Sequence, residues 1–203
     1  TGRDIVDIVM NINSNNGECL EIIGFLDDNP ELSGEFVMNY PILGTLDLAC
    51  FYSHHKFANG LGSPSSFRNR HLVIEKLKLL SDQFINIIHS SVQMAPSASL
   101  GSGLVIYPNV VIMSNVRIKN HVTILSNSTI NHDVEIGDYS IIASGVQISG
   151  EVGIGKSCYI GTGASLIQKI KVGDSCLIGM GSVLLESIPS HSKAVGNPSK
   201  LKL

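Results

Sequence analysis

Aliphatic residues recur at every sixth position of this chain. The sixteen positions of this uninterrupted series are Met94, Leu100, Ile106, Ile112, Ile118, Ile124, Ile130, Ile136, Ile142, Ile148, Ile154, Ile160, Leu166, Val172, Ile178 and Leu184. A helix has a period of 3.6 residues and a strand a period of 2.0, so neither accounts for a period of six. A short period sustained over this length is typical of a coiled β-solenoid.

Each six-residue unit predicts a short strand followed by a corner. The position two residues before the aliphatic is mostly small or β-branched, as at Val116 and Cys158, which is the alternation of a strand with one buried face. The residue just after the aliphatic is often glycine, as at Gly137 and Gly155, and we interpret it as a corner that needs positive φ. Three units close a triangular coil of eighteen residues, so the series predicts about five stacked coils.

The first 88 residues have a different pattern, in which helical and strand-like segments alternate. The expected elements are a helix near 5–12, a strand over 21–26, a short helix near 46–50, a strand over 56–63, a helix over 65–80 and a strand over 84–88. Such alternation predicts a small parallel sheet. Because no strand precedes the first helix, we expect a first strand and part of its turn to lie before Thr1. The expected domains are 1–88, 89–188 (the solenoid) and 189–203 (a capping tail).

Composition narrows the classes of partner. The net charge is −3 without a basic block, which argues against nucleic acid. No apolar run reaches the roughly 20 residues of a bilayer span, and no signal segment opens the chain. Cys158 and Cys176 lie eighteen residues apart, so we expect them to stack inward as buried thiols rather than to form a disulfide.

Two places carry candidate chemistry. Asp27-Asp28 and Gly60–Ser63 lie at the carboxyl ends of predicted strands, where ligands of parallel sheets bind, although Asp-Asp-Asn-Pro is equally good turn chemistry. The absence of a complete GxGxxG gives a dinucleotide site little support. His132 lies at a predicted corner and precedes Asp133; it is either a surface residue or a general base, because imidazole titrates near neutrality. Backbone N–H groups at the corners would supply donors to an oxyanion.

Together the motifs resemble those of the sugar O- and N-acyltransferases. The matching segments are Gly2-Arg3, Gly24–Asp28, Pro41–Gly44, Gly60–Ser63, His89–Val92, Asn131–Asp133 and Gly196–Pro198. The resemblance implies a Rossmann-like N-terminal α/β domain joined to an all-β left-handed parallel β-helix of hexapeptide repeats. The left hand comes from the resemblance alone, since the general crossover rule favours the right hand. The family that the chain resembles includes sialic acid O-acetyltransferases and N-acetyltransferases of nucleotide-linked amino sugars.

The resemblance also implies a set of site residues. His132 is then the general base and Asp133 raises its basicity, with direct transfer from acetyl-CoA and no metal. The implied cofactor contacts are Ile141, Gly150, Thr162 and Met180, and the implied sugar-nucleotide contacts are Thr1, Asp27, Asp28 and Gly62. Some amino-sugar members carry histidine at the positions of Ile141 and Thr1. Our expected function is therefore N-acetylation of a nucleotide-linked amino sugar, with O-acetylation of sialic acid or another hydroxyl as the alternative.

Related solenoids also imply a cytoplasmic homotrimer, with each site between neighbouring prisms and a role in surface polysaccharide biosynthesis. Two other functions fit the sequence less well. A metal solenoid of the γ-carbonic anhydrase type needs three converging histidines, whereas the repeats hold only His121 and His132, at different corner positions. A non-enzymatic scaffold would leave the His-Asp corner and the N-terminal domain unexplained.

Overall fold

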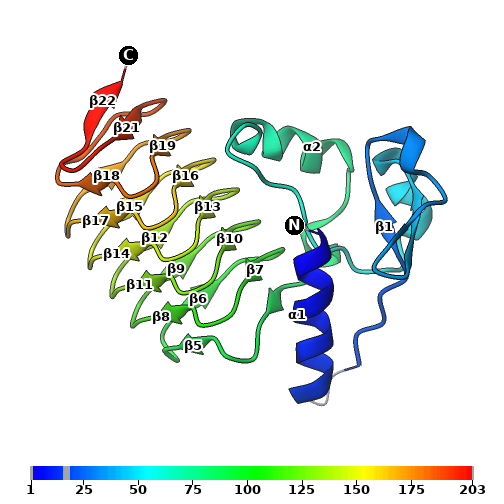
Figure 1. The fold of residues 1–203 in the computed structure, drawn as a ribbon. Helices are drawn as coiled ribbons and strands as arrows, with labels where there is room; N and C mark the ends of the chain where they lie inside the picture. The colour runs from blue at the N-terminus through cyan, green and yellow to red at the C-terminus, as the bar shows by residue number, and fades with distance from the viewer. Residues whose placement is uncertain (1, 16–18, 203) are drawn as a thin grey trace.

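A computed structural model describes residues 2–15 and 19–202 and consists of a three-sided solenoid with a smaller N-terminal part against one side (Figure 1). Its sides are three sheets, which we number 1 to 3. Sheet 1 contains β4 (Ile87–Ile88), β7 (Val105–Ile106), β10 (Thr123–Ile124), β13 (Ile141–Ile142), β16 (Tyr159–Ile160), β19 (Leu177–Ile178), β21 (Lys193–Val195) and β22 (Lys200–Lys202). Sheet 2 contains β5 (Gln93–Met94), β8 (Val111–Ile112), β11 (Thr129–Ile130), β14 (Gln147–Ile148), β17 (Ser165–Leu166) and β20 (Val183–Leu184). Sheet 3 contains β6 (Ser99–Leu100), β9 (Arg117–Ile118), β12 (Glu135–Ile136), β15 (Gly153–Ile154) and β18 (Lys171–Val172).

The strands of each side pair in parallel and in register, one coil apart. Ile124 of β10 lies opposite Ile106 of β7 and Ile142 of β13, so successive coils are offset by eighteen residues. The predicted coil length is therefore confirmed. At the end of sheet 1, β21 pairs in parallel with β19, and the antiparallel β22 forms the outer edge.

The six-residue series forms the core. From Ile106 to Leu184, no member of the series is more than 3% exposed, whereas Met94 in the first coil is 43% exposed. The smaller residues two positions earlier also point inward, and Cys158 and Cys176 are both buried free thiols, as expected. Two inward side chains in each unit thus fill the narrow interior, which is why one member of each pair is small or β-branched.

The interpretation of the corner glycines is wrong. Positive φ occurs three residues after the aliphatic, as at Asn115 (60°) and Asp133 (59°). The glycines just after the aliphatic instead lie against the next coil: a Cβ on Gly137 would be 2.6 Å from the carbonyl carbon of Gly155. At these glycines, the backbone of the next coil lies too close for a side chain, whereas equivalent positions such as Lys119 and Leu125 carry one.

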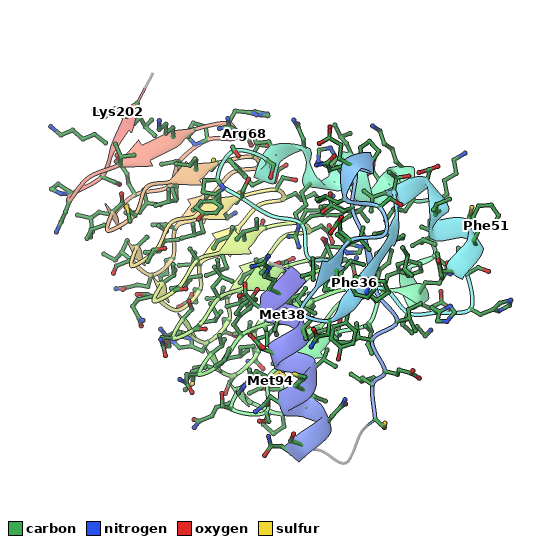
Figure 2. All side chains as sticks on the ribbon, turned by 45° about the vertical axis from the view of Figure 1, so that its right-hand side comes forward. Phe36, Met38, Phe51, Arg68, Met94 and Lys202 are labelled. Carbon is green, nitrogen blue, oxygen red and sulfur yellow. The ribbon has the colours of Figure 1, made fainter. Side chains whose placement is uncertain are left out.

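The N-terminal part begins with helix α1 (Gly2–Asn15), as predicted. Its other elements are β1 (Phe25–Leu26), η1 (Pro30–Leu32), β2 (Phe36–Val37), β3 (Tyr40–Gly44), η2 (Leu46–Tyr52), η3 (Phe67–Asn69), α2 (Arg70–Lys76) and η4 (Ser81–Gln83). The sheet order is β1-β3-β2, with β1 parallel and β2 antiparallel to β3, so the expected all-parallel sheet is wrong. Phe36 of β2 and Phe51 of η2 are 68% and 78% exposed, and both are labelled on the N-terminal part in Figure 2.

Two predicted strands lie differently from expectation. The segment 56–63 forms only an isolated bridge between Phe57 and Phe84, because its Asn-Gly-Leu-Gly-Ser stretch runs as a loop. The strand predicted over 84–88 exists as β4 but pairs with β7 of the solenoid. Ile88 packs against the solenoid core, whereas Ile87 packs in the cluster formed by α1. The apolar run indicates a strand buried on both faces, but it does not specify the partner sheet.

Helix α1 packs on the outer face of sheet 1. Its apolar stripe includes Ile5, Ile8 and Ile12, and it shares one buried cluster with Val105 and Tyr107. Sheet 1 is consequently covered on both faces in its first coils, whereas the outer residues of sheets 2 and 3 lie partly or fully exposed. This contact determines where the N-terminal part meets the repeats.

Candidate active site

His132 and Asp133 form a hydrogen-bonded pair at the corner between sheets 2 and 3. The Nδ1 atom of His132 lies 2.8 Å from Oδ2 of Asp133. Asp133 adopts the left-handed conformation of this corner and also accepts a hydrogen bond from Nδ2 of Asn115 in the preceding coil (3.2 Å). The His132 ring and then Asn115 hold the pKa of Asp133 below its usual value, so this carboxylate stays ionised at lower pH than a free aspartate.

The pairing determines which nitrogen of His132 is available. An ionised carboxylate only accepts hydrogen bonds, so Nδ1 of the neutral ring carries the proton and Nε2 has its lone pair exposed. The His132 side chain is 59% exposed. Its Nε2 can therefore take a proton from a substrate that lies outside the solenoid.

Gly150 lies directly beneath the His132 ring in the next coil. A methyl group on Gly150 would lie 2.5 Å from Cε1 and Nε2 of His132, and Gly150 does not have positive φ. The nearest atoms are the tip of an exposed side chain, so an added methyl group displaces the imidazole without straining the backbone.

For a reaction that uses His132 as its base, we expect Gly150→Ala to lower kcat/KM by about 10²-fold, because a displacement of about 1 Å at a reacting group has that cost. The thermal midpoint is expected to stay unchanged. Gly153→Ala is the matched control, since its methyl group would meet only Cγ of Lys171 at 3.9 Å. Equal kcat/KM in the two variants would show that Gly150 does not determine the position of the ring.

His121, the other histidine of the repeats, has a different environment. Its ring stacks on Tyr139 (5.2 Å between centroids) and meets Phe84 edge-on, and only 5% of the residue is exposed. Burial and then the charge of Arg70 lower its pKa to about 4, although Asp138 opposes this shift. His121 is therefore a neutral packing residue at the domain junction, and it lies at a different corner from His132.

The buried His121 is expected to make folding pH-dependent. The unfolded chain binds a proton at this position near pH 6.5, whereas the folded chain binds it only near pH 4. The free energy of unfolding is therefore expected to decrease as the pH is lowered, by about 2 kcal/mol from pH 7 to pH 5. His121→Asn suits the positive φ of this corner and is expected to make the free energy of unfolding less dependent on pH. An equal decrease of this free energy from pH 7 to pH 5 in the variant and the wild type, measured by chemical denaturation, would contradict this.

The structure separates the other predicted site residues into groups. Thr162 and Met180 lie one coil apart at the corner between sheets 1 and 2, and Met180 is 77% exposed. Ile141 lies on sheet 1, where its Cδ1 would be 2.9 Å from a Cβ on Gly62; both residues line a cavity at the domain junction. The chain therefore brings His132, Asp133 and Gly150 together at one corner, and Ile141 and Gly62 together at the domain junction. Sheet 2 separates the corner of His132 from the corner of Thr162 and Met180.

The remaining predicted contacts lie at the N-terminal sheet. Asp27 and Asp28 are exposed at the end of β1, and the Asp27 carboxylate accepts a hydrogen bond from Asn29 N–H (2.9 Å). Asp27 thus makes the turn contact that its sequence allows, and neither aspartate lines the junction cavity. Thr1 lies outside the described residues. The sequence analysis missed Asn59, Arg70 and Thr123, which lie at or behind that cavity and belong to no motif.

Within residues 2–15 and 19–202, no three His, Cys, Asp or Glu side chains gather in a group that could hold a metal ion. The same described segments include no helix with the length and hydropathy of a membrane span.

Comparisons with known proteins identify the type of chain. Residues 115–150 match the family "bacterial transferase hexapeptide (six repeats)". The acetyltransferase domain of PglB from Neisseria gonorrhoeae FA1090, solved with acetyl coenzyme A, is 27% identical over 98% of this chain and 94% of that chain, with a TM-score of 0.83. WeeI from Acinetobacter baumannii AYE is 25% identical over 99% of this chain and 94% of that chain, also with a TM-score of 0.83. These similarities indicate an acyltransferase that resembles the hexapeptide-repeat sugar acyltransferases.

The fold of this acyltransferase has a third close match. PerB from Caulobacter crescentus, solved with CoA and GDP-perosamine, is 22% identical over 99% of this chain and 92% of that chain, with a TM-score of 0.84. No curated protein matches the chain. The predicted resemblance to sugar acyltransferases is confirmed, and the parallel sheets are those of a left-handed β-helix. The Rossmann-like character of the N-terminal part stays a prediction.

Proposed function

We propose that this acyltransferase moves an acetyl group from acetyl-CoA to the amine of a nucleotide-linked amino sugar, in the cytoplasm. The His132–Asp133 pair carries this proposal. Acetyl transfer to an amine needs a base near neutrality, and the pair holds an imidazole with a free, exposed Nε2. The acetyl-CoA and CoA in the structures of the PglB domain and PerB, and the GDP-perosamine in PerB, support this choice of substrates.

In the proposed mechanism, His132 accepts the proton of the attacking amine at Nε2. Asp133 keeps the proton of the ring on Nδ1 and stabilises the imidazolium that forms. The new C–N bond replaces the C–S bond of the acetyl thioester, and the CoA thiolate leaves with the proton that His132 returns. Gly150, Thr162, Met180 and Ile141 are the proposed contacts to acetyl-CoA. Transfer is direct, because Cys158 and Cys176 are enclosed in the solenoid, and the exposed Cys19 and Cys50 belong to the N-terminal part rather than to the repeats that carry His132.

We also propose a homotrimer in which sheet 2 lies at the subunit contact. The outward residues of sheet 2 carry no charge; they are Gln93, Val111, Thr129, Gln147, Ser165 and Val183. Apolar side chains flank this sheet, including Met180 and Leu185 (53% exposed). Sheet 3, by contrast, presents the ion pairs of Glu135 with Arg117 and Lys119. A cyclic contact through sheet 2 would bring the His132 corner of one protomer to the Ile141 side of the next.

Sedimentation at micromolar concentration tests the assembly, and a monomer there would contradict it. The reaction is tested by thiol release from acetyl-CoA, with UDP- and GDP-linked amino sugars, free sialic acid and no acceptor in parallel. We expect turnover with an amino-sugar nucleotide and a product that resists alkaline hydroxylamine, since amides resist it and acetate esters do not. A hydroxylamine-labile product, or turnover with sialic acid alone, would overturn N-acetylation.

A further inference from the structure

A cavity lies where the N-terminal part meets sheet 1 of the solenoid. Its volume is about 160 Å³, and its walls come from the start of α1, the loop 59–64 and the outer face of sheet 1. Ile141 and Gly62 belong to these walls. The cavity is smaller than the roughly 300–1,000 Å³ pockets that hold complete drug-sized ligands, so it suits one group of a larger molecule.

Asn59 offers an unused donor in this cavity. The residue is only 7% exposed, and its Oδ1 accepts a hydrogen bond from the N–H of Leu61 at 3.0 Å. That bond establishes which end of the amide is oxygen, since a backbone N–H needs an acceptor. Among the described residues, Nδ2 of Asn59 has no hydrogen-bond partner. A buried donor without a partner is unfavourable, so a ligand that accepts from it is favoured.

Arg70 lies behind the cavity wall as a buried cation. It is 2% exposed, its Nη2 donates to Oγ1 of Thr123 at 2.8 Å, and its Nη1 donates to the carbonyl of Tyr139 at 3.4 Å. Within the described part of the chain, Arg70 forms no ion pair and its Nε has no partner. Burial lowers its pKa to about 10, so Arg70 remains charged at neutral pH.

Arg70 also determines how the Thr123 hydroxyl is used. A guanidinium has donors but no acceptor, so Oγ1 of Thr123 must be the acceptor in this bond. The hydroxyl proton is thereby left for another partner, and Thr123 lines the cavity. Two donors, Asn59 Nδ2 and Thr123 O–H, thus face the same space with a positive charge behind one of them. The Asp4 carboxylate also lines the cavity, where it accepts from the Tyr107 hydroxyl at 3.3 Å.

We propose that Asn59 and Thr123, with Arg70 behind Thr123, bind an anionic oxygen group of the acceptor substrate. Such a group accepts from both donors and also gains from the buried charge of Arg70, which is weakly screened in this environment. The anion would be a phosphate of a nucleoside diphosphate or the carboxylate of an acidic sugar. Asn59 and Thr123 are the binding residues, and Arg70 positions Thr123. The assignment of this anion to the acceptor substrate rests on the proposed function, whereas the binding of an anion in the cavity does not.

The test is calorimetric binding without acetyl-CoA, using two pairs that differ in charge. UDP is compared with uridine, and N-acetylneuraminate with its methyl ester. The wild type is expected to prefer one or both anions to their neutral partners, and the preferred pair identifies the source of the anion. Equal binding of anion and neutral partner in both pairs would overturn the proposal.

Variants assign the preference to these residues. Thr123→Val keeps the shape but removes the hydroxyl, and it is expected to weaken anion binding at least tenfold; Thr123→Ser, which keeps the hydroxyl, is the matched control and should bind normally. Arg70→Met is expected to lose the preference without loss of thermal stability, because an unpaired buried cation stabilises the fold little. If Arg70→Met does not fold, Thr123→Val and Thr123→Ser decide the matter alone. Wild-type affinity for the anion in Thr123→Val would overturn the proposal.

The same assay separates this inference from the proposed reaction. Anion binding that depends on Thr123, in a protein that transfers no acetyl group to any acceptor, would support the site and overturn the reaction. Acetyl transfer with anion binding unchanged in Thr123→Val would support the reaction and overturn the site.

Discussion

Replacing His132 by glutamine is expected to lower kcat/KM for acetyl transfer by about 10²–10⁴-fold, the usual contribution of a general base. The side chain of glutamine is polar and of similar size, but its amide does not accept a proton near neutral pH. Because His132 is exposed at a corner and only its Nδ1 bonds within the fold, the thermal midpoint should stay unchanged. Thiol release from acetyl-CoA measures the loss.

His54→Gln is the matched control, since His54 is exposed in the N-terminal part and lies outside the proposed site. Asp133→Asn provides a second comparison, because asparagine still accepts from Nδ1 of His132 but carries no charge. We expect a smaller loss in Asp133→Asn than in His132→Gln. Equal rates in His132→Gln and the wild type would show that another group removes the proton.

Replacing Ile136 by alanine is expected to have the largest effect on stability. Ile136 lies on β12 in the middle of the solenoid and is fully buried, so the substitution leaves a cavity among side chains of three successive coils. Comparable isoleucine-to-alanine changes in cores cost about 2–5 kcal/mol. Chemical denaturation at a fixed protein concentration measures this loss, since assembly would make stability depend on concentration.

Glu135→Ala is the control for that experiment. Glu135 is the neighbour of Ile136 on the same strand, but its side chain points outward and pairs with Arg117 and Lys119 at the surface. Exposed ion pairs contribute about 0–1 kcal/mol, so this variant should unfold close to the wild type. Equal destabilisation in the two variants would mean that burial in the series does not dominate the stability of the coil.

Much of the solenoid was predictable because its regularity is local and repeated. A six-residue unit places the same position at the same point of every coil, so the buried series, the eighteen-residue register and the inward stacking of Cys158 and Cys176 all follow from spacing. His132 and Asp133 are adjacent in the chain, so their placement at one corner also followed. The contact of His132 with Gly150 is a consequence of the same register, since the two are eighteen residues apart.

The N-terminal part was less predictable because its strands are short and their partners lie far away in sequence. Strand β4 reads as part of the N-terminal sheet, yet its backbone pairs with β7, because both faces of β4 find apolar surface there. Likewise β2 is antiparallel to β3, which the alternation of elements did not indicate. Two-residue strands carry too little pattern to specify a partner or a direction.

The sequence by itself determined the coil, its core and the histidine-carboxylate corner, because the position of each residue within the six-residue repeat determines its place in the coil. Only the tertiary structure decided the reason for the corner glycines, which is the close approach of the next backbone. It alone also brought Arg70 to Thr123, 53 residues apart, and Asn59 to the same cavity. Such contacts arise where two parts of the fold meet, and the free energy that selects them is that of the whole interface rather than of any local pattern.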